Sequence, residues 1–289
     1  MHRVTLGDFE LSILSDGNYW LDGGAMFGVV PKPLWERKAR ADEQNRITLG
    51  LNSLLVRTGD HNVLIETGIG NKLTDKARAI YGNEQRLLKS FEEAHVSPEE
   101  IDIVINTHLH FDHCGWNTML HNGNIVPTFP RARYYAQRGE WEHASTQHIR
   151  DRVSYNAPNY DPLIENGQML LIEGDCEIVP GVSVRVYPGH TRNHQAVFIR
   201  SGGQTAVYIG DLIPTTAHLD VTWVMAYDLF PLDTIESRKR FYSEAVPNGY
   251  LCVFTHDPDT PFAYVEPRGE GKYSWRALER ENSPTGVHV

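Results

Sequence analysis

Short apolar runs bounded by turn-forming residues recur along the whole chain and predict a β-rich fold. The runs are rich in Val, Ile, Leu and Tyr, and Gly, Asp, Asn or Pro stands at their ends, which is typical of strands in a sheet. The predicted strands are Phe9–Leu14, Ser53–Arg57, Val63–Glu66, Asp102–Asn106, Arg133–Ala136, Val182–Val186, Ala196–Arg200, Ala206–Ile209 and Leu251–Phe254.

Helical spacing of apolar residues occurs between some of these runs. It predicts helices over Glu84–Ala94, Gln137–Thr146 and Thr234–Ala245. The last helix follows a capping residue, Asp233, and stops at Pro247 and Gly249. Strands with interspersed helices favour an α/β fold in which sheets pack together and helices cover them.

The chain shows no linker, repeat or low-complexity tract, so we expect one domain over residues 1–289. The segment Gly23–Asn45 differs from the rest, because its sequence MFGVVPKPLW places apolar residues in a loop-like context. We expect this segment either to pack on the core as a lid or to serve as a flap over a substrate or as a dimer contact. If the segment is a dimer contact, the protein is a homodimer.

Charge and cysteine content narrow the possible partners and location. There are 27 Lys and Arg against 37 Asp and Glu, a net charge of −10, which disfavours binding to a nucleic-acid backbone. No apolar run is long enough to span a membrane, and the N-terminus lacks a signal-peptide pattern. Three widely spaced cysteines indicate reduced thiols. We therefore expect a cytoplasmic protein with no nucleic-acid or membrane partner.

The fourteen histidines are roughly twice the average usage, and their densest stretch is THLHFDHCG at residues 107–115. It follows an apolar run, and His108 and His110 would point to the same side of an extended backbone. Asp112 and His113 come after the next turn. Burying such groups without partners would cost about 1–3 kcal/mol each. Since neutral imidazole is the commonest metal ligand, the stretch predicts a metal site.

Three later residues share this sequence context. His190, Asp211 and His256 each stand just after a predicted strand, at Val182–Val186, Ala206–Ile209 and Leu251–Phe254 respectively. Side chains at the ends of different strands can converge on one site. Together with the first stretch, they give seven candidate ligands.

This pattern resembles that of the metallo-β-lactamase-fold hydrolases, over a stretch from about Leu51 to His256. The resemblance implies an αββα sandwich, an α/β fold, with the site at one edge of the two sheets. It also implies two divalent metal ions, with zinc expected and iron or manganese as alternatives. Asp112 is the implied catalytic residue, which would guide the attacking oxygen or relay a proton. The implied ligands are His108, His110 and His190 for one ion, Asp112, His113 and His256 for the other, and Asp211 for both.

A narrower resemblance is to the small-molecule branch that contains N-acyl homoserine lactonases, pyridoxolactonase and methyl parathion hydrolase. The segments FGVVPKPLW, LNSLLVRTG and HLHFDHCGWN carry it. It implies a small-molecule substrate whose ester-like bond is cleaved by a metal-bridged hydroxide, with a lactone as the leading class. Hydrolysis of a β-lactam, thioester or phosphotriester is an alternative. An iron-dependent oxidoreductase and a non-catalytic binding module are further alternatives.

The sequence departs from the family pattern at two positions. Glu66 stands where the family commonly has Asp, and because Glu is longer we expect it to alter the orientation of nearby ligands. Leu212 and its neighbours include no Tyr of the kind that lactonases place after the bridging Asp, so that role is vacant or filled by another residue such as Tyr227. We expect His194 to support or pack against the ligands and Cys114 to be a buried structural thiol. His218, seven residues after Asp211, is either a core or surface residue or faces the substrate.

Overall fold

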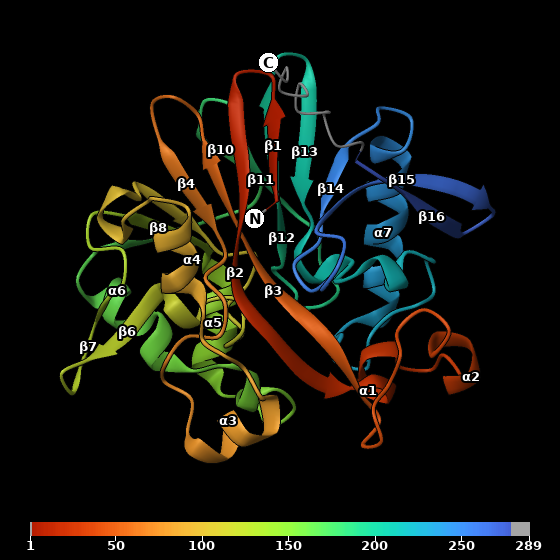
Figure 1. The fold of residues 1–289 in the computed structure, drawn as a ribbon, viewed down its shortest axis with the longest axis horizontal. Helices are drawn as coiled ribbons and strands as arrows, with labels where there is room; N and C mark the ends of the chain where they lie inside the picture. Colours follow the sequence, from red (N-terminus) through yellow and green to blue (C-terminus); the bar gives the residue numbers. More distant parts are fainter. Residues whose placement is uncertain (1, 279–289) are drawn as a thin grey trace, which may run out of the picture.

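The computed structural model describes residues 2–278, and two seven-stranded mixed sheets form its centre (Figure 1). The first sheet has the order β1-β2-β3-β4-β5-β8-β9 and the second runs from β10 to β16 in sequence order. The first sheet comprises β1 (Arg3–Leu6), β2 (Phe9–Asp22), β3 (Arg46–Arg57), β4 (Asn62–Ile65), β5 (Ile103–Ile105), β8 (Arg133–Gln137) and β9 (Met169–Ile172). The second comprises β10 (Cys176–Val179), β11 (Val182–Val186), β12 (Gln195–Ser201), β13 (Gln204–Tyr208), β14 (Leu251–Val253), β15 (Phe262–Gly269) and β16 (Lys272–Ala277).

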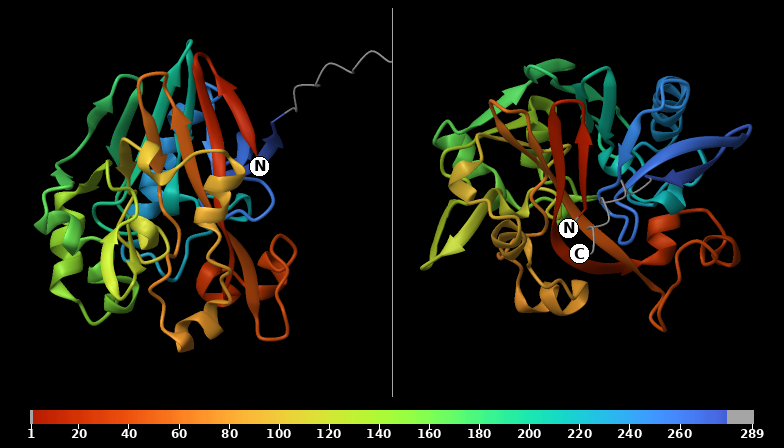
Figure 2. Two further views of the ribbon diagram at one scale, coloured as in Figure 1. Left: turned by 60° about the vertical axis from the view of Figure 1, so that its left-hand side comes forward. Right: turned by 45° about the horizontal axis from the view of Figure 1, so that its top comes forward.

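Helices and a small hairpin surround the two sheets (Figure 2). The hairpin pairs β6 (Thr118–His121) with β7 (Asn124–Pro127). The helices are α1 (Gly23–Phe27), α2 (Lys32–Trp35), α3 (Asp75–Tyr81), α4 (Leu87–Glu93), α5 (Arg138–Thr146), α6 (Asp161–Glu165) and α7 (Pro231–Ala245). Short 3-10 turns are η1 (Pro98–Glu100), η2 (Gly115–Asn117), η3 (Arg152–Ser154), η4 (Ala157–Asn159), η5 (Gly210–Leu212) and η6 (Thr216–His218).

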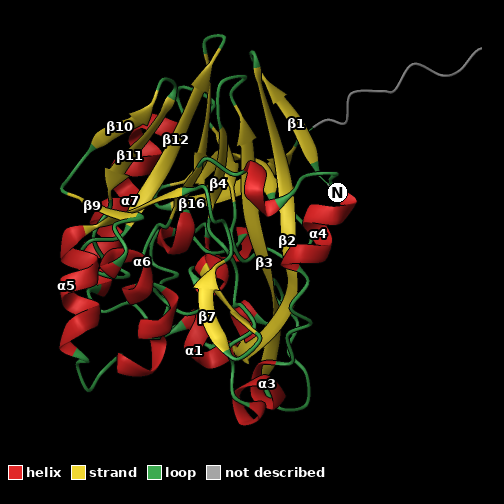
Figure 3. Cartoon of the chain, turned by 90° about the vertical axis from the view of Figure 1, so that its left-hand side faces the viewer, coloured by secondary structure: helices red, strands yellow, loops and turns green. Residues whose placement is uncertain are grey.

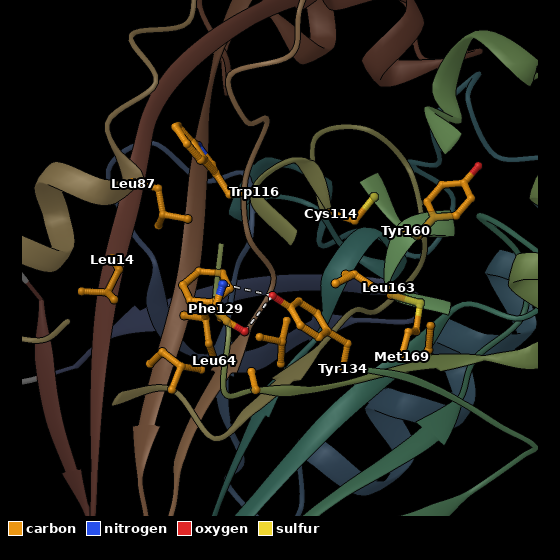
Figure 4. Packing of buried hydrophobic residues seen from close by; sticks show 14 of the residues in the cluster. Leu14, Leu64, Leu87, Cys114, Trp116, Phe129, Tyr134, Tyr160, Leu163 and Met169 are labelled. Atoms are coloured by element: carbon orange, nitrogen blue, oxygen red, sulfur yellow. Dashed lines mark hydrogen bonds between the residues drawn. The ribbon is translucent and has the colours of Figure 1, made fainter. Parts of the chain in front are cut away.

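Three apolar layers hold the sheets and helices together. The middle layer contains residues of both sheets, such as Leu54 and Val197, so the sheets pack face to face. A second layer joins the outer face of the first sheet to α4, α5 and α6 and includes Phe129 and Tyr134 (Figure 4). The third layer packs Phe241 and other residues of α7 on the outer face of the second sheet. This arrangement confirms the predicted αββα sandwich.

Two parallel strand pairs decide where the site lies. β4 and β5 are parallel, with Ile65 opposite Ile105, and β13 and β14 are parallel, with Tyr208 opposite Val253. The segments that leave the carboxyl ends of such a pair emerge at the same edge of their sheet. Backbone hydrogen bonds also join the two sheets there, since Gln195 N donates to the carbonyl oxygen of Thr107 at 2.9 Å.

The predicted strands are all present, but the first two are longer than predicted (Figure 3). β2 does not end at Leu14: it continues to Asp22 because a β-bulge between Ser15 and Asn18 absorbs the turn-like sequence Asp-Gly. β1, β6, β7, β9, β10, β15 and β16 were not predicted, because their sequences are short or mixed in polarity.

Helix α7 begins earlier than predicted. Its first residue is Pro231, so Asp233 lies in the first turn of the helix and is not its cap. Proline is favoured at a first helical position because its missing N–H needs no partner there. The predicted helix over Glu84–Ala94 is shorter in the structure, where α4 covers Leu87–Glu93.

The segment Gly23–Asn45 contains two short helices, α1 and α2, and is therefore not wholly a loop. Met26, Phe27 and Trp35 are buried in it, and the Phe27 and Trp35 rings stack with centroids 5.1 Å apart. The segment is thus packed on the core, although the Val29 side chain is 90% exposed. Between residues 2 and 278, none of the helices has the length and apolar character needed to cross a bilayer.

Candidate metal centre

The seven candidate ligands converge at the edge where the parallel strand pairs end. His108, His110, Asp112 and His113 follow β5, whereas His190, Asp211 and His256 follow β11, β13 and β14 of the second sheet. All seven side chains are buried. The structure therefore brings together these side chains from the ends of different strands, as predicted.

The first group consists of three imidazoles, those of His108, His110 and His190. Their ring centroids lie 4.4 to 4.9 Å apart. Nε2 of His190 and Nδ1 of His110 face one another at 3.1 Å. Each ring offers a nitrogen to the same point in space, which is the arrangement that a bound cation requires.

The second group consists of Asp112, His113 and His256. Nε2 of His256 lies 3.1 Å from Nε2 of His113. Oδ2 of Asp112 lies 3.7 Å from the Nε2 atoms of both histidines. This group therefore also gathers three ligand atoms around one point.

Asp211 lies between the two groups. Its Oδ2 atom is 3.2 Å from Nε2 of His190, and its Oδ1 atom is 3.1 Å from Nε2 of His256. One carboxylate oxygen thus faces each group. That is how a carboxylate shared by two cations would have to lie.

Unsatisfied buried atoms test whether this donor set fits metal ions. Among the described residues, Nε2 of His108 and Oδ1 of Asp211 are buried and lack a hydrogen-bond partner. Leaving such atoms unpaired costs free energy, because burial removes the water that would otherwise bind them. Imidazole and carboxylate donors suit zinc and iron. The residues therefore fit divalent cations of this kind.

Burial and nearby charges favour the metal-binding form of His108 and Asp211, whereas nearby carboxylates raise the pKa of His113 and His190 despite their burial. Burial, together with the nearby imidazoles of His113 and His110, lowers the pKa of His108 well below its usual value, so this ring is neutral. Burial would raise the pKa of Asp211, but His113 and His256 hold that pKa well below its usual range. Asp211 therefore carries a negative charge between the groups.

Contacts of the Nδ1 atoms with neighbouring residues fix the orientation of three of the imidazoles. Nδ1 of His190 lies 2.9 Å from Oδ1 of Asp228, and Nδ1 of His256 lies 2.9 Å from the carbonyl oxygen of Gly50. Both contacts use the ring nitrogen away from the other ligands, so Nε2 is left to face the centre. Nδ1 of His108 is 2.9 Å from Oγ1 of Thr107.

Glu140 on α5 joins the segments that carry two ligands of the first group. Its buried carboxylate accepts hydrogen bonds from Oγ1 of Thr191 at 2.6 Å, from the Tyr155 hydroxyl at 2.9 Å and from Leu109 N at 3.3 Å. Leu109 stands beside His110 in the chain, and Thr191 stands beside His190. Glu140 and Asp228 were not singled out from the sequence, since each stands alone without a motif.

Glu66 reaches the centre from the end of β4. Its backbone has a φ of 62°, in the left-handed region, and its Oε1 atom accepts a hydrogen bond from Thr107 N at 2.7 Å. The same oxygen lies 3.6 Å from Nδ1 of His113. The longer side chain is therefore accommodated behind a ligand of the second group.

The other singled-out residues have distinct surroundings. Nε2 of His194 accepts a hydrogen bond from Asp211 N at 3.0 Å, so this histidine supports the centre as expected. His218 is fully buried between Thr215 and the Met26 carbonyl and does not line the cavity, so it is a core residue and the substrate-facing alternative is wrong. Cys114 is buried, with Sγ near the carbonyl oxygens of Leu109 and His110.

A cavity of about 270 Å³ opens beside the two groups. His110, Asp112, His190 and Asp211 lie on its polar side. Its other walls are mostly apolar or aromatic and include Tyr19, Met26, Phe111, Met225 and Tyr227. Arg150 and Asp151 also line the cavity, so a small molecule there would contact the candidate ligands, apolar side chains and these two charged groups.

Comparison with known proteins connects this geometry with characterised relatives. Residues 47–256 match the family model described as the metallo-beta-lactamase superfamily. An N-acyl homoserine lactonase of Bacillus sp is 28% identical over 159 residues, which is 51% of this chain and 57% of the relative. The chain thus matches less than two thirds of the length of this relative.

Solved structures resemble the chain over nearly its full length. A probable metal-dependent hydrolase from Staphylococcus aureus is 33% identical, with a TM-score of 0.86, and the match covers 96% of this chain and 100% of that one. The dizinc quorum-quenching lactonase AidC, solved with a product, is 21% identical with a TM-score of 0.81 and coverage of 97% and 98%. The second likeness shows the shared fold.

Proposed function

Because the chain belongs to the metallo-beta-lactamase superfamily, we propose that it is a metal-dependent hydrolase of small lactones. The observation that carries this proposal is the position of Asp211 between two buried groups of ligand atoms beside a cavity. Lactonases among its relatives support the choice of bond. A lactone is small enough for the cavity and presents a carbonyl carbon for attack.

The proposed ions are two zinc ions per chain. His108, His110 and His190 would hold one, Asp112, His113 and His256 the other, and Asp211 would contact both. The dizinc content of AidC supports this number and this metal. When bound, two such ions lower the pKa of a shared water to about 7 and polarise a carbonyl oxygen.

Asp112 has the proposed role of moving protons. Its carboxylate lines the cavity and is 8% exposed, so it meets both the centre and the substrate space. It would take the proton from the attacking oxygen and return it to the ring oxygen as the acyl C–O bond breaks, which yields a hydroxy acid. Phe111 and Met225 also line the cavity and would reduce the access of bulk water to it.

The cavity walls support a lactone that carries an apolar substituent. Leu21, Met26 and Leu229 line the cavity and offer apolar surface beside the charged side chains of Arg150 and Asp151. Burial of apolar surface there would favour binding by about 25 cal/mol per Å². The proposal therefore covers lactones with an aliphatic or aromatic side group.

Metal analysis and a substrate panel test the proposal together. We expect the purified protein to contain two zinc ions per chain and to open lactone rings, and His110→Ala to lose both the metal of the first group and the activity. A single redox-active iron with oxygen consumption would overturn the hydrolase. Two bound ions with turnover of aryl esters or phosphotriesters, and none of lactones, would overturn the lactone substrate.

A further inference from the structure

Tyr19 reaches the candidate centre because of an irregularity in β2. In a regular strand, residues five apart such as Leu14 and Tyr19 lie on opposite faces of the sheet. Here Leu14 pairs with Ser53 and Tyr19 pairs with Leu49, so the bulge places both on the same face. Asn83 supports the bulge, since its Nδ2 donates hydrogen bonds to the carbonyl oxygens of Asp16 and Asn18. The bulge thus sets where the Tyr19 ring points.

The Tyr19 hydroxyl donates a hydrogen bond to Oδ2 of Asp112 over 2.7 Å. Nδ1 of His256 is also near the hydroxyl, at 3.4 Å, but that nitrogen lies closer to the Gly50 carbonyl, at 2.9 Å. A carbonyl can only accept, so the Nδ1 proton of His256 goes to Gly50 and this nitrogen cannot accept from Tyr19. The phenol proton is therefore directed at Asp112.

This hydrogen bond falls on the oxygen of Asp112 that faces the second group. The same Oδ2 atom lies 3.7 Å from Nε2 of His113 and of His256. Within residues 2–278, no other side chain or backbone group hydrogen-bonds to the Asp112 carboxylate. The Tyr19 side chain is 1% exposed, so water does not compete for the contact from its side. Among the described residues, Tyr19 is thus the only hydrogen-bond donor to this oxygen.

We propose that Tyr19 is a positioning residue that holds Oδ2 of Asp112 in place and thereby sets the affinity of the second group for its metal ion. The inference rests on the proposed function only in that the second group binds a cation. The first group has no contact with the Tyr19 hydroxyl, so its affinity does not depend on it. Tyrosine is needed here because the phenol supplies the donor that phenylalanine lacks.

Tyr19→Phe tests this role, because it keeps the ring and removes only the hydroxyl. The chain is stripped with a chelator and titrated with Zn²⁺ by calorimetry, so that two binding steps are resolved. We expect Zn²⁺ binding at the second group to become about 10- to 100-fold weaker and binding at the first group to stay unchanged. Tyr242→Phe is the matched control: it removes another buried hydroxyl, which donates to the Leu219 carbonyl at 2.6 Å and not to a candidate ligand. This control should leave both binding steps unchanged.

A double-mutant cycle separates positioning from a general structural effect. If Tyr19 acts through Asp112, Tyr19→Phe weakens Zn²⁺ binding in the wild-type background but has no further effect in the Asp112→Ala background. Equal weakening of Zn²⁺ binding in both backgrounds would overturn the proposal. So would Zn²⁺ binding at the second group of Tyr19→Phe that is as tight as in the wild type. A chain that binds two zinc ions but opens no lactone would refute the proposed function and leave this test intact.

Discussion

Nδ1 of His190 lies 2.9 Å from Oδ1 of Asp228, and both side chains are almost wholly buried. The carboxylate accepts the Nδ1 proton, so that Nε2 of the same ring carries a lone pair toward the first group. The two residues are 38 positions apart in the sequence, and the pairing is produced by the fold.

Removal of this carboxylate should weaken metal binding at the first group. We expect Asp228→Ala to lower zinc affinity there by about 10- to 100-fold, because the ring is no longer held in one tautomer and orientation. Titration with Zn²⁺ against a competing chelator measures the effect. Asp233→Ala on the exposed side of α7 is the control and should bind zinc as the wild type does. Wild-type affinity in Asp228→Ala would show that the pairing has no role in binding.

Glu140→Gln should destabilise the fold around the first group. The Glu140 carboxylate accepts three hydrogen bonds, and an amide has only one oxygen with which to accept them. We expect a loss of about 1–3 kcal/mol in the free energy of unfolding of the metal-free protein, measured with urea. Glu142→Gln, on the exposed face of the same helix, should change it by less than about 0.5 kcal/mol. Equal stability of the two variants would contradict the role assigned to Glu140.

His218 should make stability depend on pH. Burial, and the nearby Arg238 guanidinium, lower the pKa of His218 to about 3 in the folded chain, whereas the pKa in the unfolded chain is near 6.5. Between these two pKa values, His218 is protonated in the unfolded chain but not in the folded chain. The free energy of unfolding therefore falls as the pH falls. At about pH 4.5 the loss from this residue is about 3 kcal/mol.

His218→Gln tests this assignment, because glutamine can keep a hydrogen bond to the Met26 carbonyl and does not titrate. Urea unfolding of the metal-free variant and wild type, followed from neutral pH into acid, should give a flatter curve for the variant. Parallel curves would show that His218 does not contribute to the acid sensitivity. Taking the difference cancels the contributions of the other buried histidines.

Metal removal should lower the thermal stability of the whole chain. Ligand atoms of both sheets meet in each group, and an ion that binds only the folded chain stabilises it by about 2.7 kcal/mol at a concentration of 100 times its Kd. We expect Zn²⁺ to raise the unfolding temperature of the stripped protein and a chelator to reverse the shift. Mg²⁺ should have little effect, since the groups are rich in imidazole. An unfolding temperature insensitive to Zn²⁺ would argue against a metal centre.

The sequence was sufficient to predict the candidate ligands because each stands at a recognisable strand exit. His190, Asp211 and His256 follow apolar runs whose strands the structure contains, and the sandwich brings those exits to one edge. Tyr19 was not predicted, since it lies beyond Leu14, where the pattern indicates the end of a strand. Its position depends on a bulge whose residues, read locally, favour a turn.

Contacts between distant single residues were equally inaccessible. Asp228 and Glu140 have no motif around them, and their importance appears only when the fold places them beside His190 and Leu109. The choice between the two alternatives for His218 was also out of reach. Its spacing from Asp211 left a substrate-facing position open, but the turn η6 directs the ring toward the Met26 carbonyl.

The order of strands divides the chain into two consecutive halves. Every strand of the first sheet lies before residue 173, and every strand of the second lies after residue 175. Each candidate group draws side chains from both halves, so neither half contains a complete set. The exposed connection Glu173–Asp175 is therefore a natural point at which to cut the chain. Two fragments divided there would each lack part of the centre, and recovery of zinc binding on mixing would report that the halves had reassembled.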